Sequence, residues 1–349
     1  MRRRSGNPSD MPPREAMERF LDSSRLDRAD ETIRTYRYRL KLFVEWCEVY
    51  EIDRVGAFDG TVFDDYRRQR TGDGLAPSTL RNEMQTIKKW VEYLEEIEAV
   101  DDGLGEKVRV PRPSPDQETD ETMLEPEVAQ ELLQGFRDHA TNYGIREHAW
   151  LELAWHTGAR VGGLRALDIR DYYPDGEGGP YVEFLHRPST GTTLKNGVDG
   201  SRPVGLPETV AEVLDHYIEN YRHDHRDQEG RQPLFTSQRG RPTRNTMRMW
   251  SYKATWPCWT QECPHGREPR HCDYRTHQRG SQCPSSLSPH PIRTGSITWQ
   301  RDLGIPPEVV AERVNASLDV IEQHYDQASK LERLERRRRP YVNQMQIDP

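Results

Sequence analysis

Residues 288–326 constrain most strongly what this chain can fold into. His290 and Arg293 lie three positions apart, a spacing that places both on one face at the start of a helix. Ser317 is a suitable N-cap for a second, short helix, on which Leu318, Ile321 and Tyr325 share one face. The shared face predicts that the phenol of Tyr325 points inward, toward the site lined by His290 and Arg293. The alternative is a packed core aromatic and a surface histidine, which is the commoner situation for either residue alone.

Two upstream motifs supply matching groups. Arg160 ends the segment WHTGAR, and Lys195 stands in the segment TLKN, ahead of RPVGLP at 202–207. The order Arg160, Lys195, His290-x-x-Arg293, Tyr325 resembles the tyrosine recombinase (phage integrase) family, over roughly residues 120–326. Each motif alone is weak, but four motifs in this order are a specific signal.

The resemblance implies a role for each residue. Tyr325 would be the nucleophile that forms a 3′-phosphotyrosyl bond with double-stranded DNA. Arg160 and Arg293 would bind the phosphate, because each guanidinium fork matches two oxygens. Lys195 would be the general acid for the 5′-oxygen, and His290 an acid/base assistant. Catalysis would need no cofactor, because the arginines supply the positive charge. The family also implies a homotetramer on DNA, with a dimer at each site.

Three positions depart from the family's pattern. Asn315, which we include among the catalytic candidates, stands where the family usually carries His or Trp; it can donate a hydrogen bond but cannot carry a proton. It lies ten residues before Tyr325, whereas nine is more usual. Gly163 replaces an acidic residue, and Thr294 follows Arg293 where His is common. None of these changes removes the nucleophile or the phosphate-binding arginines.

The periodicity predicts a mainly α chain with a small antiparallel β-sheet. We expect a disordered tail at 1–12 and helices beginning near residues 13, 32, 59 and 77 in a domain at 13–100. This domain resembles the family's four-helix core-binding (SAM-like) domain. A Pro-rich linker is expected at 101–119, then the catalytic domain at 120–330, with strands near 181–185 and 202–206. By resemblance, the basic tail at 331–349 would dock onto a neighbouring protomer; a solvated tail is the alternative.

Basic residues on two helices of the first domain are candidates for binding DNA phosphates. They are Arg34, Arg37, Arg39, Lys88 and Lys89. The alternative is that they are solvated helix faces, which would be the better interpretation without the downstream motifs.

An insertion at 258–283, absent from the family's usual core, carries four of the five cysteines. It resembles insertions in haloarchaeal integrase relatives. Clustered Cys and His in a cytoplasmic protein favour structural Zn²⁺ over disulfides. Our first-choice ligands are Cys263, His265, Cys272 and Cys283, with Cys258 as a fifth candidate. Reduced thiols without metal are the alternative. A zinc site here would brace the helix that begins near residue 289.

Composition limits the class of protein. No run of about 18 apolar residues exists, and no signal peptide follows Met1, so we expect a cytoplasmic protein. The net charge of −8 argues against binding DNA through a simply basic surface. Of the 50 basic residues only seven are lysines, and this acidic, arginine-rich composition resembles proteins of salt-loving archaea. A GC-rich genome is the alternative explanation.

Two other functions remain open. The first is a related type IB-like topoisomerase, which would use the same residues without a four-protomer synapse. The second is a catalytically weak DNA-binding regulator of a mobile element. The sequence gives neither the target site nor the direction of recombination.

Overall fold

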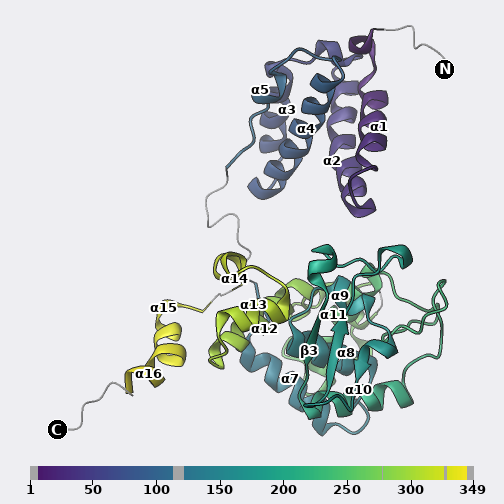
Figure 1. The fold of residues 1–349 in the computed structure, drawn as a ribbon. Helices are drawn as coiled ribbons and strands as arrows, with labels where there is room; N and C mark the ends of the chain where they lie inside the picture. Colours follow the sequence, from purple (N-terminus) through teal and green to yellow (C-terminus); the bar gives the residue numbers. More distant parts are fainter. Residues whose placement is uncertain (1–6, 113–121, 277, 326–327, 344–349) are drawn as a thin grey trace. The chain divides into compact units, whose positions relative to one another are not determined.

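Two hydrophobic cores divide the chain, one within the unit Met1–Asp120 and the other within the unit Glu121–Pro349. The computed structural model describes residues 7–112, 122–276, 278–325 and 328–343. Figure 1 shows a bundle of helices in the first unit, and helices around short strands in the second. The predicted fold class, mainly α with a small antiparallel sheet, is confirmed.

The first unit is built from amphipathic helices that pack around aromatic side chains. Asp59 caps the third helix by accepting hydrogen bonds from two amides of its first turn, and Pro77 begins the fourth. The ring of Phe43 lies at the centre of the core, in contact with the rings of Tyr66 and Trp90. The helices are α1 (Pro13–Ser24), α2 (Asp30–Val49), α3 (Gly60–Gly72), α4 (Pro77–Glu96) and the short α5 (Leu104–Lys107).

The boundaries of this unit differ from those expected. Residues 7–12, expected in a disordered tail, include the 3₁₀ turn η1 (Pro8–Asp10) and Met11, which joins the core. Leu104 and Val108, expected in the linker, are also buried in that core. Apolar side chains in both segments therefore extend the packed unit. Residues 1–6 and 113–119 of these two segments lie outside the described residues.

The second unit contains a three-stranded antiparallel sheet. Its strands are β1 (Tyr172–Tyr173), β2 (Tyr181–Phe184) and β3 (Arg202–Gly205), in the order β1-β2-β3. Val182 pairs with Val204 in the register of β2 and β3. Both valines are buried, which is the alternation expected of a sheet covered on one face. Strands β2 and β3 were predicted from the sequence, whereas the two-residue β1 was not.

Helices surround this sheet and α8 (Arg146–Thr157) lies among them. Trp150, Leu151, Leu153 and Trp155 are all buried, and so are most of the other residues of α8, as expected of a central helix. It packs against α10, α11 and α12. The other helices are α7 (Pro126–Asp138), α9 (Val161–Ala166), α10 (Glu208–Asn220), α11 (Arg244–Ala254), α12 (Pro289–Asp302), α13 (Pro307–Val314), α14 (Leu318–His324), α15 (Lys330–Glu332) and α16 (Arg339–Asn343).

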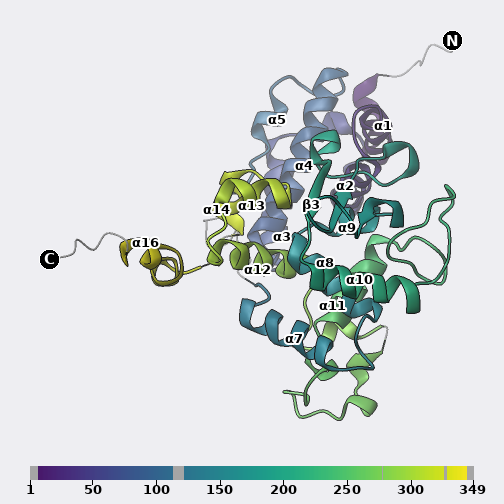
Figure 2. The same cartoon turned by 60° about the horizontal axis from the view of Figure 1, so that its bottom comes forward.

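The cysteine-rich insertion forms an irregular lobe of short 3₁₀ turns, seen in green at the bottom of Figure 2. These turns are η6 (Pro257–Trp259), η7 (Pro269–His271), η8 (Asp273–Arg275) and η9 (Gly280–Gln282). The lobe packs against α7 and α11. The guanidinium of Arg275 lies 4.9 Å from the centre of the Trp259 ring, and the indole N–H of Trp256 donates to the carbonyl of Gly280. These contacts hold the turns of the lobe together.

Among the described residues, no helix is long and apolar enough to cross a membrane.

Candidate active site

Tyr325 directly follows α14, at the edge of a small core formed with α12 and α13. The hydroxyl of Ser317 caps α14 by accepting the amide of Val320, as predicted. At the other end, the hydroxyl of Thr298 on α12 donates to the carbonyl of Tyr325 (2.9 Å). Both ends of α14 are therefore fixed, and the tyrosine side chain is buried.

His290, Arg293 and Tyr325 come together, as the sequence predicted. The centroid of the His290 ring lies 5.4 Å from that of Tyr325. The guanidinium carbon of Arg293 lies 4.9 Å from the centre of the same phenol ring. The histidine is exposed in the first turn of α12, whereas the arginine is 2% exposed. The phenol therefore has a buried cation and a solvent-accessible imidazole beside it.

Arg293 is held by the protein through one nitrogen. Its Nη1 donates to the carbonyls of Gly158 (2.5 Å) and Val314 (2.8 Å). Neither Nε nor Nη2 has a carbonyl or carboxylate acceptor among the described residues. Burial and then the charge of Arg160 lower the pKa of Arg293 to about 10, against the opposing effect of Tyr325. Arg293 therefore remains a cation at neutral pH, with two nitrogens not used by backbone carbonyls.

Arg160 and Asn315 meet at the end of α13. Arg160 immediately precedes α9, and its Nη1 donates to the carbonyl of Asn315 (2.6 Å). Asn315 caps α13 in the left-handed conformation, with φ of 50°, where Gly and Asn are favoured. Its Oδ1 accepts a hydrogen bond from Nδ2 of Asn196 (2.8 Å). Asn315 is thus a helix cap that contacts two of the predicted catalytic segments.

Lys195 is exposed on the hairpin between β2 and β3. Its neighbours on both sides are anchored. The amide of Leu194 donates to Nδ1 of His186 (3.0 Å), and Asn196 bonds Asn315. The backbone of the hairpin is fixed on both sides of a lysine that reaches solvent.

Two further arginines, which were not predicted from the sequence, belong to the site. Nε of Arg202 donates to the carbonyl of Arg313 (2.7 Å), and its guanidinium lies over the ring of Phe184. Burial, and then the charges of Arg293, Arg160 and Arg313, lower the pKa of Arg202 to about 10. Burial also lowers the pKa of Arg313. The one signal in the sequence for Arg202 is its place at the start of a predicted strand, directly after the lysine hairpin.

The four arginines form a cluster of cations. None of Arg160, Arg202, Arg293 and Arg313 has a carboxylate within ion-pair distance in the part of the chain that the structure describes. Neighbouring arginine charges lower the pKa of Arg202 and Arg293, and an anion in this positive potential would relieve the repulsion. The cluster can therefore bind a phosphate beside Tyr325.

A buried ionic network lies under this cluster on α8. Arg137 donates to Glu152 (2.7 Å), and His148 and His156 both lie within 3.2 Å of the same carboxylate. Burial alone would raise the pKa of Glu152, but the hydrogen bonds from these three groups hold it well below its ordinary value. Glu152 is therefore ionised at neutral pH and fixes the helix that leads to Arg160.

Comparison with solved structures gives the family. The N-terminal domain of a phage integrase/site-specific recombinase from Haloarcula marismortui is 46% identical; the match covers 29% of this chain and 97% of that domain, with a TM-score of 0.29. The identity over nearly all of that domain is decisive. The chain belongs to the tyrosine recombinase (phage integrase) family.

Structures of other tyrosine recombinases share the fold of the whole chain. The Tn1549 transposon integrase, solved with a circular intermediate DNA, is 13% identical over 96% of this chain and 100% of that one, with a TM-score of 0.63. Lambda integrase, solved as a tetramer on a Holliday junction, is 13% identical over 93% of this chain and 80% of that one, with a TM-score of 0.61. No family model matches the chain, and no curated protein matches it.

The basic residues of the recombinase's first unit are placed unequally. Arg34 and Arg39 line a shallow pocket of about 420 Å³ between α2 and α4. Arg37 instead pairs with Glu18 through two hydrogen bonds, which raise its pKa. Nζ of Lys89 lies 3.3 Å from the hydroxyl of Tyr36, and Lys88 is half-buried. Arg34 pairs with Glu31, which also lines this pocket, and Arg39 donates to Thr86, so both have partners within the protein.

The predicted metal ligands are not assembled into a site. Among the described residues, no three His, Cys, Asp or Glu side chains form a group that could hold a metal ion. His265, a first-choice ligand, has its Nε2 bonded to the hydroxyl of Ser285 (2.8 Å). Burial raises the pKa values of Cys258 and Cys283, and both thiols lie close enough to Cys263 for its charge to add to the rise.

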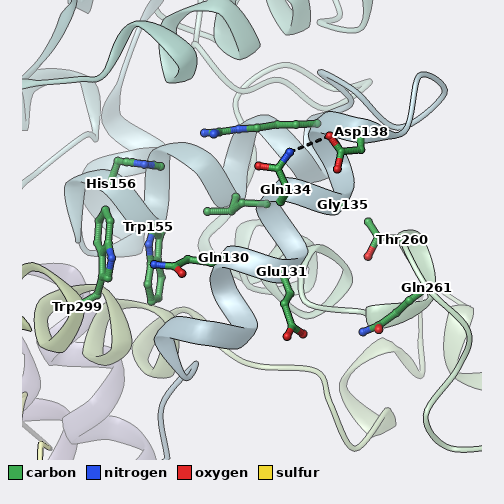
Figure 3. A pocket seen from close by; sticks show the side chains of 12 residues that line it. Gln130, Glu131, Gln134, Gly135, Asp138, Trp155, His156, Thr260, Gln261 and Trp299 are labelled. Carbon is green, nitrogen blue, oxygen red and sulfur yellow. Dashed lines mark hydrogen bonds between the residues drawn. The ribbon is translucent and has the colours of Figure 1, made fainter. Parts of the chain in front are cut away.

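An open pocket of about 830 Å³ lies between α7, α8, α12 and the insertion (Figure 3). Its lining includes the carboxylates of Glu131 and Asp138, the latter accepting a hydrogen bond from Gln134. The rings of Trp155 and Trp299 also contribute. Arg137 and His156 also line it, so its charge is mixed, unlike that of the arginine cluster.

Proposed function

We propose that this protein cuts and rejoins double-stranded DNA at specific sites through a 3′-phosphotyrosine intermediate. The observation that carries the proposal is the Tyr325 phenol beside Arg293 and His290, within a cluster of arginines that pairs with no carboxylate among the described residues. A nucleophile, charge for the non-bridging oxygens and an acid/base group are what phosphoryl transfer to a phenol requires.

In the proposed reaction, the phenol oxygen of Tyr325 attacks the phosphorus, and the P–O bond to the 5′-oxygen breaks. Arg160 and Arg293 stabilise the charge that develops on the non-bridging oxygens. His290 accepts the phenol proton, and Lys195 gives a proton to the departing 5′-oxygen. The new phosphodiester keeps the energy of the broken one, so a 5′-hydroxyl of another strand can reverse the reaction without ATP.

We further propose that DNA is bound by a homotetramer, with a dimer at each site. The support is the shared fold with lambda integrase, which has been solved as a tetramer on a Holliday junction and as a dimer on a core site. In this chain, Arg336 bonds Glu127 and Arg337 bonds Asp302, so the tail packs on its own catalytic unit. Docking of the tail onto a neighbouring protomer would have to replace these ion pairs.

Strand exchange tests the proposed activity against its alternatives. Two duplexes, each containing a randomised segment and its own fluorophore, are incubated with the protein, and products that carry both labels are sequenced. Recombinant products at a defined sequence are expected. Relaxation of supercoiled plasmid without exchange would instead indicate a type IB-like topoisomerase. Binding without any strand cleavage would indicate a DNA-binding regulator.

We also propose that the insertion binds one structural Zn²⁺ through Cys258, Cys263, Cys272 and Cys283. His265 and Ser285 join two similar turns, in which Gly266 and Ser286 donate backbone hydrogen bonds to Cys263 and Cys283. Two cysteine-proline turns side by side suit thiolate ligands, and Cys258 is taken as the fourth ligand because its thiol lies near those of Cys263 and Cys283. Metal would have to draw the thiols closer than they lie here.

Elemental analysis of protein purified without chelator tests the zinc proposal. One Zn²⁺ per chain is expected, and Cys258→Ser and Cys283→Ser should lose it. Cys47→Ser is the control, because Cys47 is buried in the core of the other unit. Absence of stoichiometric metal in the wild type would leave the cysteines as reduced thiols.

A further inference from the structure

Three consecutive carbonyls at the end of α13 each accept a hydrogen bond from a different arginine. The carbonyl of Arg313 accepts from Arg202, that of Val314 from Arg293 (2.8 Å), and that of Asn315 from Arg160 (2.6 Å). The last carbonyls of a helix lack partners within the helix and carry the negative end of its dipole, so they favour cations. The turn at 313–315 therefore sets the direction of three guanidinium groups.

The side chain of Asn315 extends the same turn to the lysine hairpin. Its Oδ1 accepts from Nδ2 of Asn196, the residue after Lys195. A Cβ atom at Gly200, further along the hairpin, would lie 2.7 Å from Nδ2 of Asn315, so the amide is closely enclosed there. The left-handed backbone at Asn315 places its carbonyl toward Arg160 while the amide faces the hairpin.

The turn also leads directly into the helix of the nucleophile. Ser317, two residues after Asn315, caps α14, and Tyr325 follows that helix. One short segment therefore contacts the phosphate-binding arginines, the hairpin of the general acid and the helix of the nucleophile. In a reaction without a mobile cofactor, the mutual alignment of such groups sets the rate.

We propose that Asn315 is a positioning residue that holds the Lys195 hairpin against the arginine cluster. This inference rests on the proposed function, because it assigns Asn315 a part in protonating the 5′-oxygen. Asn315 would act through Asn196 and the backbone of Lys195, without itself touching the phosphate. Its side-chain acceptor is used by Asn196, and its carbonyl by Arg160.

Asn315→Gly is the decisive variant. Glycine adopts the left-handed conformation freely, so the three carbonyl contacts should persist while the amide is lost. A general acid displaced by about 1 Å should slow cleavage roughly 100-fold. On a duplex with sulfur in place of the 5′-bridging oxygen, which leaves without protonation, the loss should shrink to a few-fold. A purely structural defect would slow both substrates alike.

Asn196→Ala supplies the second arm of the test. It should reproduce the Asn315→Gly defect and its rescue by sulfur, and the double variant should be no slower than either single variant. Asn220→Ala, which removes an exposed amide bonded to His216, is the matched control and should cleave normally. Thermal unfolding of each variant checks that the fold is retained.

Two results would overturn the inference while leaving the proposed function intact. One is equal defects of Asn315→Gly on the oxygen and sulfur substrates. The other is defects of the two single variants that multiply in the double variant. A wild-type protein that cleaves neither substrate would overturn the proposed function, and the inference with it.

Discussion

The environment of Tyr325 is asymmetric at the scale of single residues. Arg293 is buried beneath the phenol, whereas His290 is exposed beside it. A buried guanidinium keeps its direction when DNA binds, and an exposed imidazole can exchange protons with water. The two residues are therefore suited to different tasks, one to binding the phosphate and the other to moving a proton.

Lys195→Ala tests the general acid. Cleavage should fall about 10²–10⁴-fold, the usual effect of removing a general acid, because the 5′-oxygen then leaves unprotonated. A 5′-bridging sulfur substrate should restore much of the rate. Lys107→Ala, in the first unit, is the control and should behave as wild type. Equal defects of Lys195→Ala on both substrates would assign Lys195 another role.

The residues that the sequence revealed differ in kind from those it did not. His290, Arg293 and Tyr325 could be predicted because helical spacing is local and the order of motifs is specific to the family. Arg202 and Arg313 join the site through tertiary contacts, and a strand arginine or a helix arginine has no local signature. The left-handed conformation of Asn315 was also invisible, although Asn at a helix end is compatible with it.

At the scale of elements, the end of α13 and the whole of α8 position the site. α13 directs arginines through its last carbonyls, whereas α8 carries Glu152, which binds Arg137 and two histidines. The helices were predictable from their apolar stripes, and β2 and β3 from flanking turn residues. Strand β1 is too short to show a periodicity. Parts of the expected tail and linker instead pack against the first core. They do so through a few isolated apolar residues, such as Met11 and Leu104, which form no periodic pattern in the sequence.

Inorganic phosphate should stabilise the wild-type protein against thermal unfolding. A ligand that binds only the folded state raises stability, and the unpaired arginines offer it a site. The increase in Tm should exceed that given by chloride at equal ionic strength. It should be smaller in Arg160→Gln but unchanged in Arg239→Gln, which removes an exposed arginine of the same unit. Equal increases with both salts would contradict an anion site.

Glu152 makes stability dependent on pH in a defined direction. Its pKa is lower in the folded state than in the unfolded chain, so its contribution is present above the unfolded pKa of about 4.3 and lost as pH falls below it. Glu152→Gln should cost roughly 3 kcal/mol at neutral pH, because Arg137 loses its counter-ion. Denaturant unfolding at pH 7 and pH 4 measures both effects. If the difference in free energy of unfolding between variant and wild type does not narrow at low pH, Glu152 is not the source of this pH dependence.

The whole molecule combines an acidic net charge with local arginine clusters. Each phosphate contact should contribute about −0.9 to the log–log slope of DNA affinity against salt. If acidic surfaces of the protein take up cations when DNA binds, this uptake offsets the cations that the DNA releases. Such an offset is expected of a protein adapted to high salt. Arg37 pairs with Glu18 and Arg34 with Glu31, so a count of basic residues overstates the cations that are free to contact phosphates.

We therefore expect a shallow dependence of DNA affinity on KCl, measured from low to molar concentration. Asp65→Asn, which removes an exposed carboxylate on α3, should steepen it. Asp64 is the weaker choice, because it already pairs with Arg67 and Arg68. A wild-type slope as steep as that of an ordinary basic DNA-binding protein would rule out the adaptation to salt without affecting the recombinase proposal.

Trapping a covalent protein–DNA adduct tests whether Tyr325 attacks DNA. Duplexes with a randomised segment and a nick that lets the cut strand diffuse away are incubated with wild type and Tyr325→Phe, and DNA that stays with denatured protein is sequenced. Wild type should retain DNA through its cut 3′ phosphate, with the phosphopeptide mapping to Tyr325. The variant should retain none, while its DNA affinity stays within a few-fold, because the phenol oxygen contributes little to ground-state binding. An adduct formed by the variant, or mapping to another residue of the wild type, would mean that Tyr325 is not the nucleophile.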